Sequence, residues 1–156
     1  MAGTTAANHF SMICVQLELQ GSEQHFFQAV DAKGNVISMD ANESALNTNL
    51  GARPMQLLLM ALGGCSGVDV LSILKKQKQK VEQLSITIQG ERANTVPSPW
   101  KSVHVIFTFQ GELEAQKCER ACALSIEKYC SVAETLRLAG ATITWKAIVN
   151  QNSYAS

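Results

Sequence analysis

Two of the five cysteines in the chain occur where a reactive thiol would be useful. Cys65 lies in ALGGCSGVDVLSIL, the most apolar stretch, and Cys130 lies in EKYCSVAETL, at the break between two helical patterns. A thiolate oxidised by a peroxide becomes a sulfenic acid, which condenses with a second thiol to form a disulfide. The two cysteines are therefore a candidate redox pair. The competing interpretation is that both are small hydrophobic residues that pack in the core.

The residues around Cys65 favour a reactive thiol, but they do not exclude a thiol that only packs in the core. Gly63 and Gly64 each cost a helix roughly 1 kcal/mol relative to alanine, so something must compensate for them. Close approach of another backbone or of a ligand is the expected compensation. Asp69 follows four residues later on the same helical face, which places an ionisable group beside the thiol or at an exposed position.

Cys130 directly precedes Ser131, and Glu134 follows three residues after that serine. This spacing is typical of a capping box and predicts a helix that begins at Ser131. The partial positive charge at a helix N-terminus favours a thiolate, although cysteine also suits a packing position just before a helix.

The remaining cysteines suggest no other site. Cys118 and Cys122 are four residues apart and could be two metal ligands, but no histidine or further cysteine near them has metal-site spacing. A packed helix face is the favoured interpretation, so neither a metal nor a cofactor is predicted. Cys14 is expected to be incidental, and an odd number of cysteines does not indicate a disulfide framework.

Composition excludes several classes of function. The 156 residues include thirteen acidic and thirteen basic side chains, which gives no indication of binding to nucleic acid or to an anionic membrane. The N-terminus resembles no secretory signal, so a cytoplasmic location with reduced thiols is expected. Residues 54–74 are long enough to span a membrane, but Gln56, Asp69 and three glycines favour a buried central helix.

Hydrophobic periodicity predicts an α+β fold. One domain is expected over residues 11–150, between a flexible N-terminus at 1–10 and a tail at 151–156. Pro54 suits the first turn of the long helix, and Gly140 should end the last helix. The expected order is strands at 13–19, 25–30 and 36–39, a helix at 54–78, strands at 84–88 and 103–109, helices at 112–127 and 131–138, and a strand at 143–149.

Three segments together resemble a known family. RPMQLLLMALGGCSGVDVLSILKK, the later QGER, and LSIEKYCSVAETL are similar to the OsmC/Ohr family of hydroperoxide-handling proteins. They resemble its small uncharacterised OsmC-like branch more than its organic hydroperoxide resistance branch. The resemblance implies an intertwined homodimer in which antiparallel sheets wrap around central helices. It also implies that the catalytic pair is Cys65 and Cys130.

The chain departs from the peroxidase branches of that family at two points. Those branches have a glutamate after the proline that opens the central helix, and this chain has Met55 followed by Gln56. They also bring an arginine from the N-terminal strands to the thiolate, whereas here no arginine precedes Arg53. Because a nearby cation stabilises a thiolate, slow peroxide turnover is predicted unless Arg53 or Lys33 substitutes.

These observations predict a thiol-dependent peroxidase that acts on small organic or lipid-derived hydroperoxides. Cys65 would be the nucleophile, Cys130 would resolve its sulfenic acid, and an external dithiol would reduce the disulfide. The alternative is a non-enzymatic redox sensor or a protein that binds a small apolar ligand on the same scaffold. The residues expected to bind the substrate are Arg53, Met55, Gln56, Met60 and Leu62.

Overall fold

The computed structural model describes residues 12–21, 25–40 and 50–150, which form parts of two compact units, 1–54 and 55–156. The predicted N-terminal segment and C-terminal tail lie outside the described residues, and the prediction of a single domain over residues 11–150 stays a prediction.

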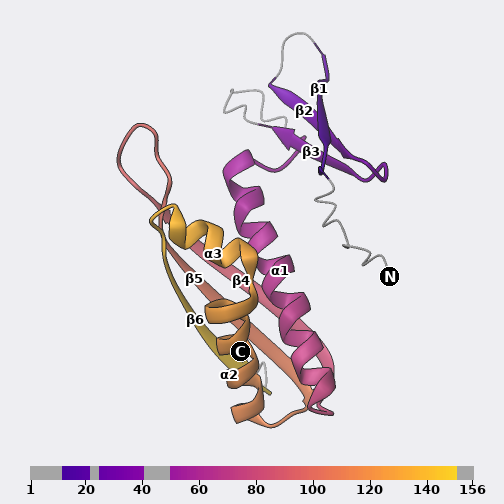
Figure 1. Ribbon diagram of the computed structural model, residues 1–156, viewed down its shortest axis with the longest axis vertical. Helices are drawn as coiled ribbons and strands as arrows, with labels where there is room; N and C mark the ends of the chain where they lie inside the picture. The colour runs from indigo at the N-terminus through magenta and orange to yellow at the C-terminus, as the bar shows by residue number, and fades with distance from the viewer. Residues whose placement is uncertain (1–11, 22–24, 41–49, 151–156) are drawn as a thin grey trace, which may run out of the picture. The chain divides into compact units, whose positions relative to one another are not determined.

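The first unit is a three-stranded antiparallel meander in the order β1-β2-β3, shown in indigo and purple in Figure 1. A turn after β2 is held by Asp31, whose Oδ1 accepts the amide protons of Lys33 and Asn35 at 2.8 and 2.9 Å. Gly34 has a φ of 84°, a conformation that glycine adopts without strain. The three predicted strands are confirmed, with bounds β1 (Val15–Leu19), β2 (Phe26–Asp31) and β3 (Val36–Asp40).

The apolar face of β1 is exposed. Val15, Leu17 and Leu19 alternate along the strand and are 58%, 52% and 54% exposed. An alternating apolar face normally packs against a second layer. This face therefore has the composition of a surface that another layer covers.

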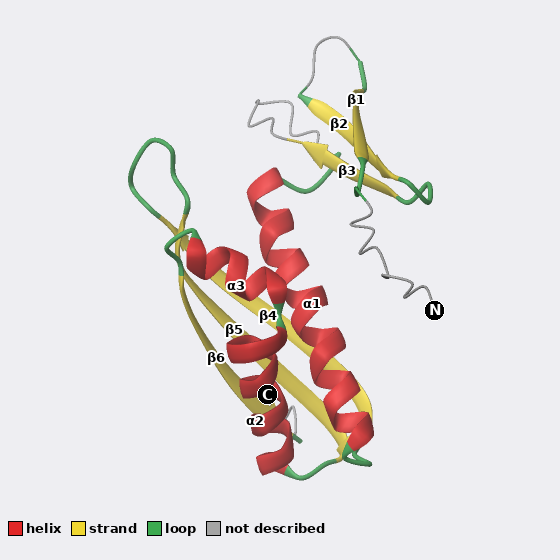
Figure 2. Ribbon diagram, viewed as in Figure 1, coloured by secondary structure: helices red, strands yellow, loops and turns green. Residues whose placement is uncertain are grey.

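The second unit is a three-stranded sheet in the order β4-β5-β6 with helices on one face (Figure 2). Strands β4 and β5 form an antiparallel hairpin, but β5 and β6 pair in parallel, so the expectation of antiparallel sheets is wrong for this sheet. The helical connection between β5 and β6 allows this pairing, because parallel strands need a long crossover. Its elements are α1 (Pro54–Lys76), β4 (Lys80–Arg92), β5 (Trp100–Glu112), α2 (Ala115–Leu124), η1 (Ser125–Tyr129), α3 (Ser131–Leu138) and β6 (Thr142–Val149).

The core lies between this sheet and its helices. The inward side chains of β5 are buried and face apolar residues of α1, α2 and α3. By length and composition α1 could span a membrane, but it packs as the core helix of this soluble domain. The main members of the core are Leu62, Val70, Leu74, Val103, Val105, Phe107, Phe109, Ile126, Ala133 and Leu136.

Two of the glycines in α1 are explained by the sheet beneath the helix. A Cβ atom at Gly63 would lie 3.1 Å from Cδ1 of Ile88, and one at Gly67 would lie 2.9 Å from Cδ1 of Ile86. Glycine at these positions thus lets α1 lie close to β4. The cost of glycine to the helix is therefore compensated by packing against side chains of the sheet, and not by the predicted approach of a backbone or a ligand. Gly64 differs, because a Cβ atom there would meet no other atom within 4 Å.

The helical segment after β5 differs from the prediction in two ways. The expected continuous helix over 112–127 is an α-helix that widens into the π-helix η1. The predicted capping box is wrong: the N-cap of α3 is Cys130, whose sulfur accepts the amide proton of Ala133 at 3.4 Å. Because the N-cap is one residue earlier than predicted, Ser131 is the first residue of the helix.

Candidate functional site

A compact cluster in the second unit joins two thiols and a carboxylate. The Sγ atoms of Cys65 and Cys130 and one carboxylate oxygen of Asp69 all lie within 4.8 Å of one another. Cys65 and Asp69 are one helical turn apart on α1, and Cys130 is 65 residues later in the sequence. The fold therefore brings together the two cysteines that the sequence selected as a pair.

The π-helix and the turn that follows it position Cys130. The amide of Cys130 donates a hydrogen bond to the carbonyl oxygen of Ser125 at 2.8 Å. Cys130 itself has an extended conformation, with φ −70° and ψ 105°, which ends η1 and starts α3. π-Helical turns inside helices often occur at functional sites. Here the turn is directly followed by the residue that supplies one of the clustered sulfur atoms.

Ser125 of η1 contacts α1 beside the cluster. Its hydroxyl group lies 3.2 Å from Oδ2 of Asp69 and 3.2 Å from the carbonyl oxygen of Ser66, and its side chain is fully buried. Asp69 was expected near the thiol from the sequence, whereas Ser125 was not. No local pattern marks this serine, because only the packing of η1 against α1 brings it to the carboxylate.

The two thiols of the cluster differ in access to solvent. Cys130 is only 3% exposed, whereas Cys65 is partly exposed. Burial raises the pKa of the Cys130 thiol to about 11, and the neighbouring Cys65 adds to this increase, while the amide of Ala133 opposes it. Cys130 is therefore a neutral thiol at pH 7. Of the two, Cys65 is the thiol that a dissolved reagent reaches more easily.

The cluster has an acidic character. Asp69 forms no ion pair with any of the described residues, and its hydrogen-bond partner Ser125 is neutral. Burial rather than a neighbouring charge is the main influence on the pKa of Cys130. The site thus presents one carboxylate and two sulfur atoms, and no cation from the described part of the chain is ion-paired with the carboxylate.

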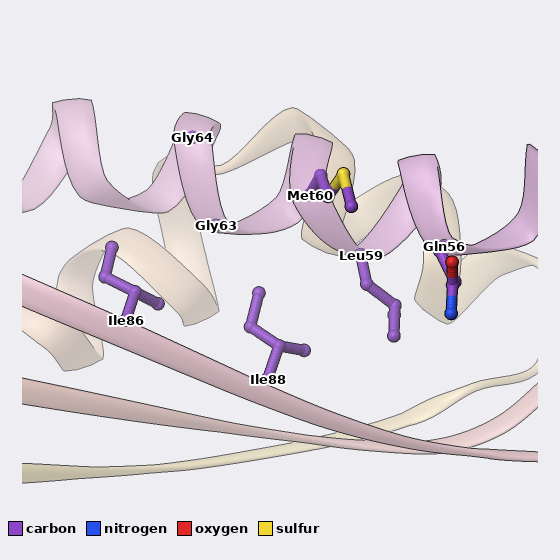
Figure 3. A pocket seen from close by; sticks show the side chains of 7 residues that line it. All are labelled: Gln56, Leu59, Met60, Gly63, Gly64, Ile86 and Ile88. Atoms are coloured by element: carbon purple, nitrogen blue, oxygen red, sulfur yellow. The ribbon is translucent and has the colours of Figure 1, made fainter. Parts of the chain in front are cut away.

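A groove of about 650 Å³ lies between α1 and β4, lined mostly by apolar side chains (Figure 3). In Figure 3, Ile86 and Ile88 point from the strand toward the helix, and Leu59 points toward the strand. Pockets of a few hundred to about 1,000 Å³ are typical of sites for small molecules. The lining residues are Gln56, Leu59, Met60, Gly63, Gly64, Ile86 and Ile88.

The structure separates the five predicted substrate-binding residues. Gln56 and Met60 line the groove, but Leu62 is fully buried in the core and does not. Met55 packs against the core, and its carbonyl oxygen accepts a hydrogen bond from Nε1 of Trp100 at 3.2 Å. Arg53 belongs to the first unit. The role of each of these residues in substrate binding stays a prediction.

Comparison with known proteins relates most of the chain to one protein family. Residues 47–146 match the family described as OsmC-like protein. Protein YhfA of Escherichia coli K12 is 36% identical over 126 residues, which cover 80% of this chain and 91% of YhfA.

Solved structures extend the relationship to the fold. The structure of a hypothetical protein from Aquifex aeolicus VF5 superposes with a TM-score of 0.73 at 33% identity, covering 90% of this chain and 98% of that one. The organic hydroperoxide resistance protein OhrB of Bacillus subtilis superposes with a TM-score of 0.60 at 15% identity, covering 87% and 97%. At that identity the similarity to OhrB concerns the fold alone.

Proposed function

The chain belongs to the OsmC-like family, and from this premise we propose that it is a thiol-dependent peroxidase for small organic hydroperoxides. The family includes peroxidases of the Ohr and OsmC type, whereas the relatives of higher identity, YhfA and the Aquifex protein, are uncharacterised. The activity proposed for this chain therefore depends on its own residues.

The observation that carries the proposal is the proximity of two free thiols from distant parts of the sequence. The Sγ atoms of Cys65 and Cys130 lie within 4.8 Å, and a disulfide requires about 2.05 Å. Cys130 immediately follows a π-helical turn rather than lying inside a regular helix. Side-chain rotation with a small local movement can close the remaining distance.

The proposed reaction has three steps. The Cys65 thiol first loses its proton to water, and the thiolate attacks the peroxide oxygen that bears the hydrogen. The O–O bond breaks, the sulfenic acid of Cys65 forms, and the departing alkoxide takes a proton from water to become the alcohol. The sulfur of Cys130 then attacks the sulfenic sulfur, and water leaves as the disulfide forms. An external dithiol reduces that disulfide by thiol–disulfide exchange and returns two thiols. The partial exposure of Cys65 and the burial of Cys130 support this order of roles.

The apolar groove supports an organic substrate rather than hydrogen peroxide. Leu59, Met60 and Ile88 offer apolar contact to an alkyl or aryl group, and Gln56 adds a polar side chain at one end. Gly63 and Gly64 line the groove and directly precede Cys65 in the sequence. Burial of apolar substrate surface in this groove would provide the binding free energy.

We also propose that the active protein is a cytoplasmic homodimer. On α1, Leu58, Val68 and Leu71 are 40%, 66% and 43% exposed, so an apolar side of this long helix is uncovered. The exposed face of β1 in the first unit has the same character. A second copy of the chain that covers both surfaces would bury apolar area from water, in agreement with the tendency of the family to form dimers.

Consumption of cumene hydroperoxide by the reduced protein, with a dithiol as the reductant, tests the proposed function. Turnover should require both Cys65 and Cys130, and mass spectrometry of the oxidised protein should find them joined in a disulfide. Reduction of the peroxide by the double variant Cys65→Ser/Cys130→Ser at the wild-type rate would refute the proposal.

A second candidate function is binding of a small apolar ligand without turnover. The specific observation in its favour is the size and apolar lining of the groove between α1 and β4. Saturable binding of an apolar fluorescent dye by a protein that consumes no hydroperoxide would favour this alternative. Reversible disulfide formation without turnover would indicate a redox sensor instead.

A further inference from the structure

We propose that Cys65, Asp69 and Cys130 of the reduced protein form a binding site for one Zn²⁺ ion per chain. The sequence predicted no metal site, because no ligand pattern is visible within any short segment. Here α1 supplies two ligands and the residue before α3 supplies the third. The inference concerns the reduced site and does not depend on peroxidase activity.

The distances within the cluster suit the ion. Zinc binds sulfur at about 2.3 Å and carboxylate oxygen at about 2.0–2.2 Å, so two ligands of a tetrahedral site lie about 3.6–3.8 Å apart. The three candidate atoms already lie within 4.8 Å of one another. Each pair of atoms must therefore approach by at most about 1.2 Å, which is within the reach of side-chain rotation.

The chemical character of the ligands selects the metal. Two thiolates with one carboxylate are a donor set for zinc, whereas Mg²⁺ prefers oxygen ligands and an octahedral geometry. As Zn²⁺ binds, each sulfur exchanges its proton for a bond to the metal, so two protons are released and the two thiolates and the carboxylate surround the cation. Three protein ligands with one side open to solvent leave a fourth position for water.

A second contact supports the same inference. The hydroxyl group of Ser125 is 3.2 Å from Oδ2 of Asp69 and is fully buried. Carboxylates that bind metals are commonly held in place by such a hydrogen bond, which fixes the direction of the free oxygen. Asp69 has no ion-pair partner among the described residues, so a cation would not have to displace one.

The test is a titration of the fully reduced protein under anaerobic conditions, with Zn²⁺ in competition with a chromophoric chelator. Co²⁺ serves as a second metal, because its thiolate complexes absorb in the near ultraviolet and show the visible spectrum of a tetrahedral ion. We expect one bound Zn²⁺ per chain, a Co²⁺ spectrum typical of thiolate ligands, and no binding of Mg²⁺.

Variants of the proposed ligands and of Ser125 test where the zinc ion binds. Asp69→Asn, which keeps the size of the side chain, and Cys65→Ser should each weaken zinc binding by at least about tenfold, since the first replaces an anionic ligand oxygen with a neutral amide oxygen and the second removes a thiolate ligand. Ser125→Ala should weaken it by about tenfold or more through the lost orientation of Asp69. Cys118→Ala is the matched control, because it removes a buried thiol of the same unit that lies outside the cluster, and it should leave the affinity unchanged.

Two results would overturn the proposal. One is the absence of stoichiometric zinc binding by a reduced protein whose circular dichroism shows that it is folded. The other is equal zinc affinity in the wild type, Asp69→Asn and Cys65→Ser. Peroxide consumption measured in the presence of a metal chelator is independent of both results, so the zinc site and the proposed enzyme activity can fail separately.

Discussion

The second unit contains two pairs of cysteines whose surroundings differ sharply. Cys65 and Cys130 lie on separate elements, with their sulfur atoms within 4.8 Å of each other and of Asp69. Cys118 and Cys122 lie one turn apart on α2, and both are fully buried in the core. Side chains four residues apart on a helix have Cβ atoms about 5–6 Å apart, whereas a disulfide needs about 3.5–4.5 Å. The pair on α2 is therefore fixed in a geometry that disfavours a disulfide.

The two pairs also differ in the burial and the polar neighbours of their thiols. Burial raises the pKa of Cys122 to about 12, with the neighbouring Cys118 adding to the effect, and burial also raises the pKa of Cys118. Both are neutral, inaccessible thiols that act as small hydrophobic side chains. The other pair has a partly exposed member and a polar neighbour. Proximity in space, access to solvent and a polar partner together distinguish a candidate reactive pair from a packed one.

The largest expected effect is the loss of peroxide consumption in Cys65→Ser, because the replacement removes the proposed nucleophile. Cys118→Ala should retain activity, since it changes only packing, at a stability cost of about 1 kcal/mol. Consumption of cumene hydroperoxide by the two variants measures the difference. Full activity in Cys65→Ser would assign the chemistry to another residue and remove the distinction between the pairs.

Cys130→Ser should stop the cycle after a single oxidation of each chain. Without a resolving thiol the sulfenic acid of Cys65 persists, and a nucleophilic trap such as dimedone should add to it. Mass spectrometry of the trapped protein locates the adduct, and Cys122→Ala is the matched control that should still form a disulfide. Sustained turnover by Cys130→Ser under the same reductant would show that Cys130 is not required for resolution.

Two exposed apolar residues, one on α1 beside Cys65 and one at the end of α3, should also differ in their response to a surface charge. Val68 lies on α1, one turn after Cys65, and is 66% exposed in a single chain. If a partner subunit covers this side, Val68→Glu should convert the dimer to a monomer, because a buried carboxylate without a partner is costly. Leu138→Glu on α3, where the leucine is 81% exposed, is the matched control and should remain dimeric.

Light scattering at micromolar concentration measures both proteins. A stable, folded monomer of the wild type would contradict the proposed homodimer. A dimer that persists in Val68→Glu would place the interface on another surface.

The smallest expected effect is a difference in the pH dependence of stability. A thiol whose pKa is raised by folding stabilises the native state below its unfolded pKa, near 9.0, and this contribution disappears as the pH rises through the folded value. Stability should therefore fall above about pH 9, by roughly 1 kcal/mol per pH unit for each such thiol. The decrease due to Cys122 should extend to about pH 12, and that due to Cys130 to about pH 11.

Denaturant unfolding of the reduced protein at pH 8, 9 and 10 measures this slope. Both Cys122→Ala and Cys130→Ala should reduce it, whereas Cys14→Ala, at an exposed position, should not. Identical slopes in all four proteins would mean that burial does not hold these thiols in their neutral form.

Much of the fold followed from the sequence. Alternation of apolar residues predicted β1, β4, β5 and β6, and turn residues around short segments predicted β2 and β3. Pro54 and the long apolar run predicted α1 within two residues of its end. These features are local, since a repeat of two or of 3.6 residues is set by the chain itself. The choice of Cys65 and Cys130 also came from the sequence, through the resemblance to a family and the apolar segment around Cys65.

Tertiary structure decided what each of these residues contacts. The helix begins at Ser131 as predicted, but the capping box failed because Cys130, which ends η1, occupies the N-cap position and its sulfur accepts the amide proton of Ala133. Ser125 joined the site only because η1 packs against α1. Gly63 proved to be a packing position above Ile88. Contacts between elements distant in the sequence depend on how helices and sheet pack, and no local pattern of residues records that packing.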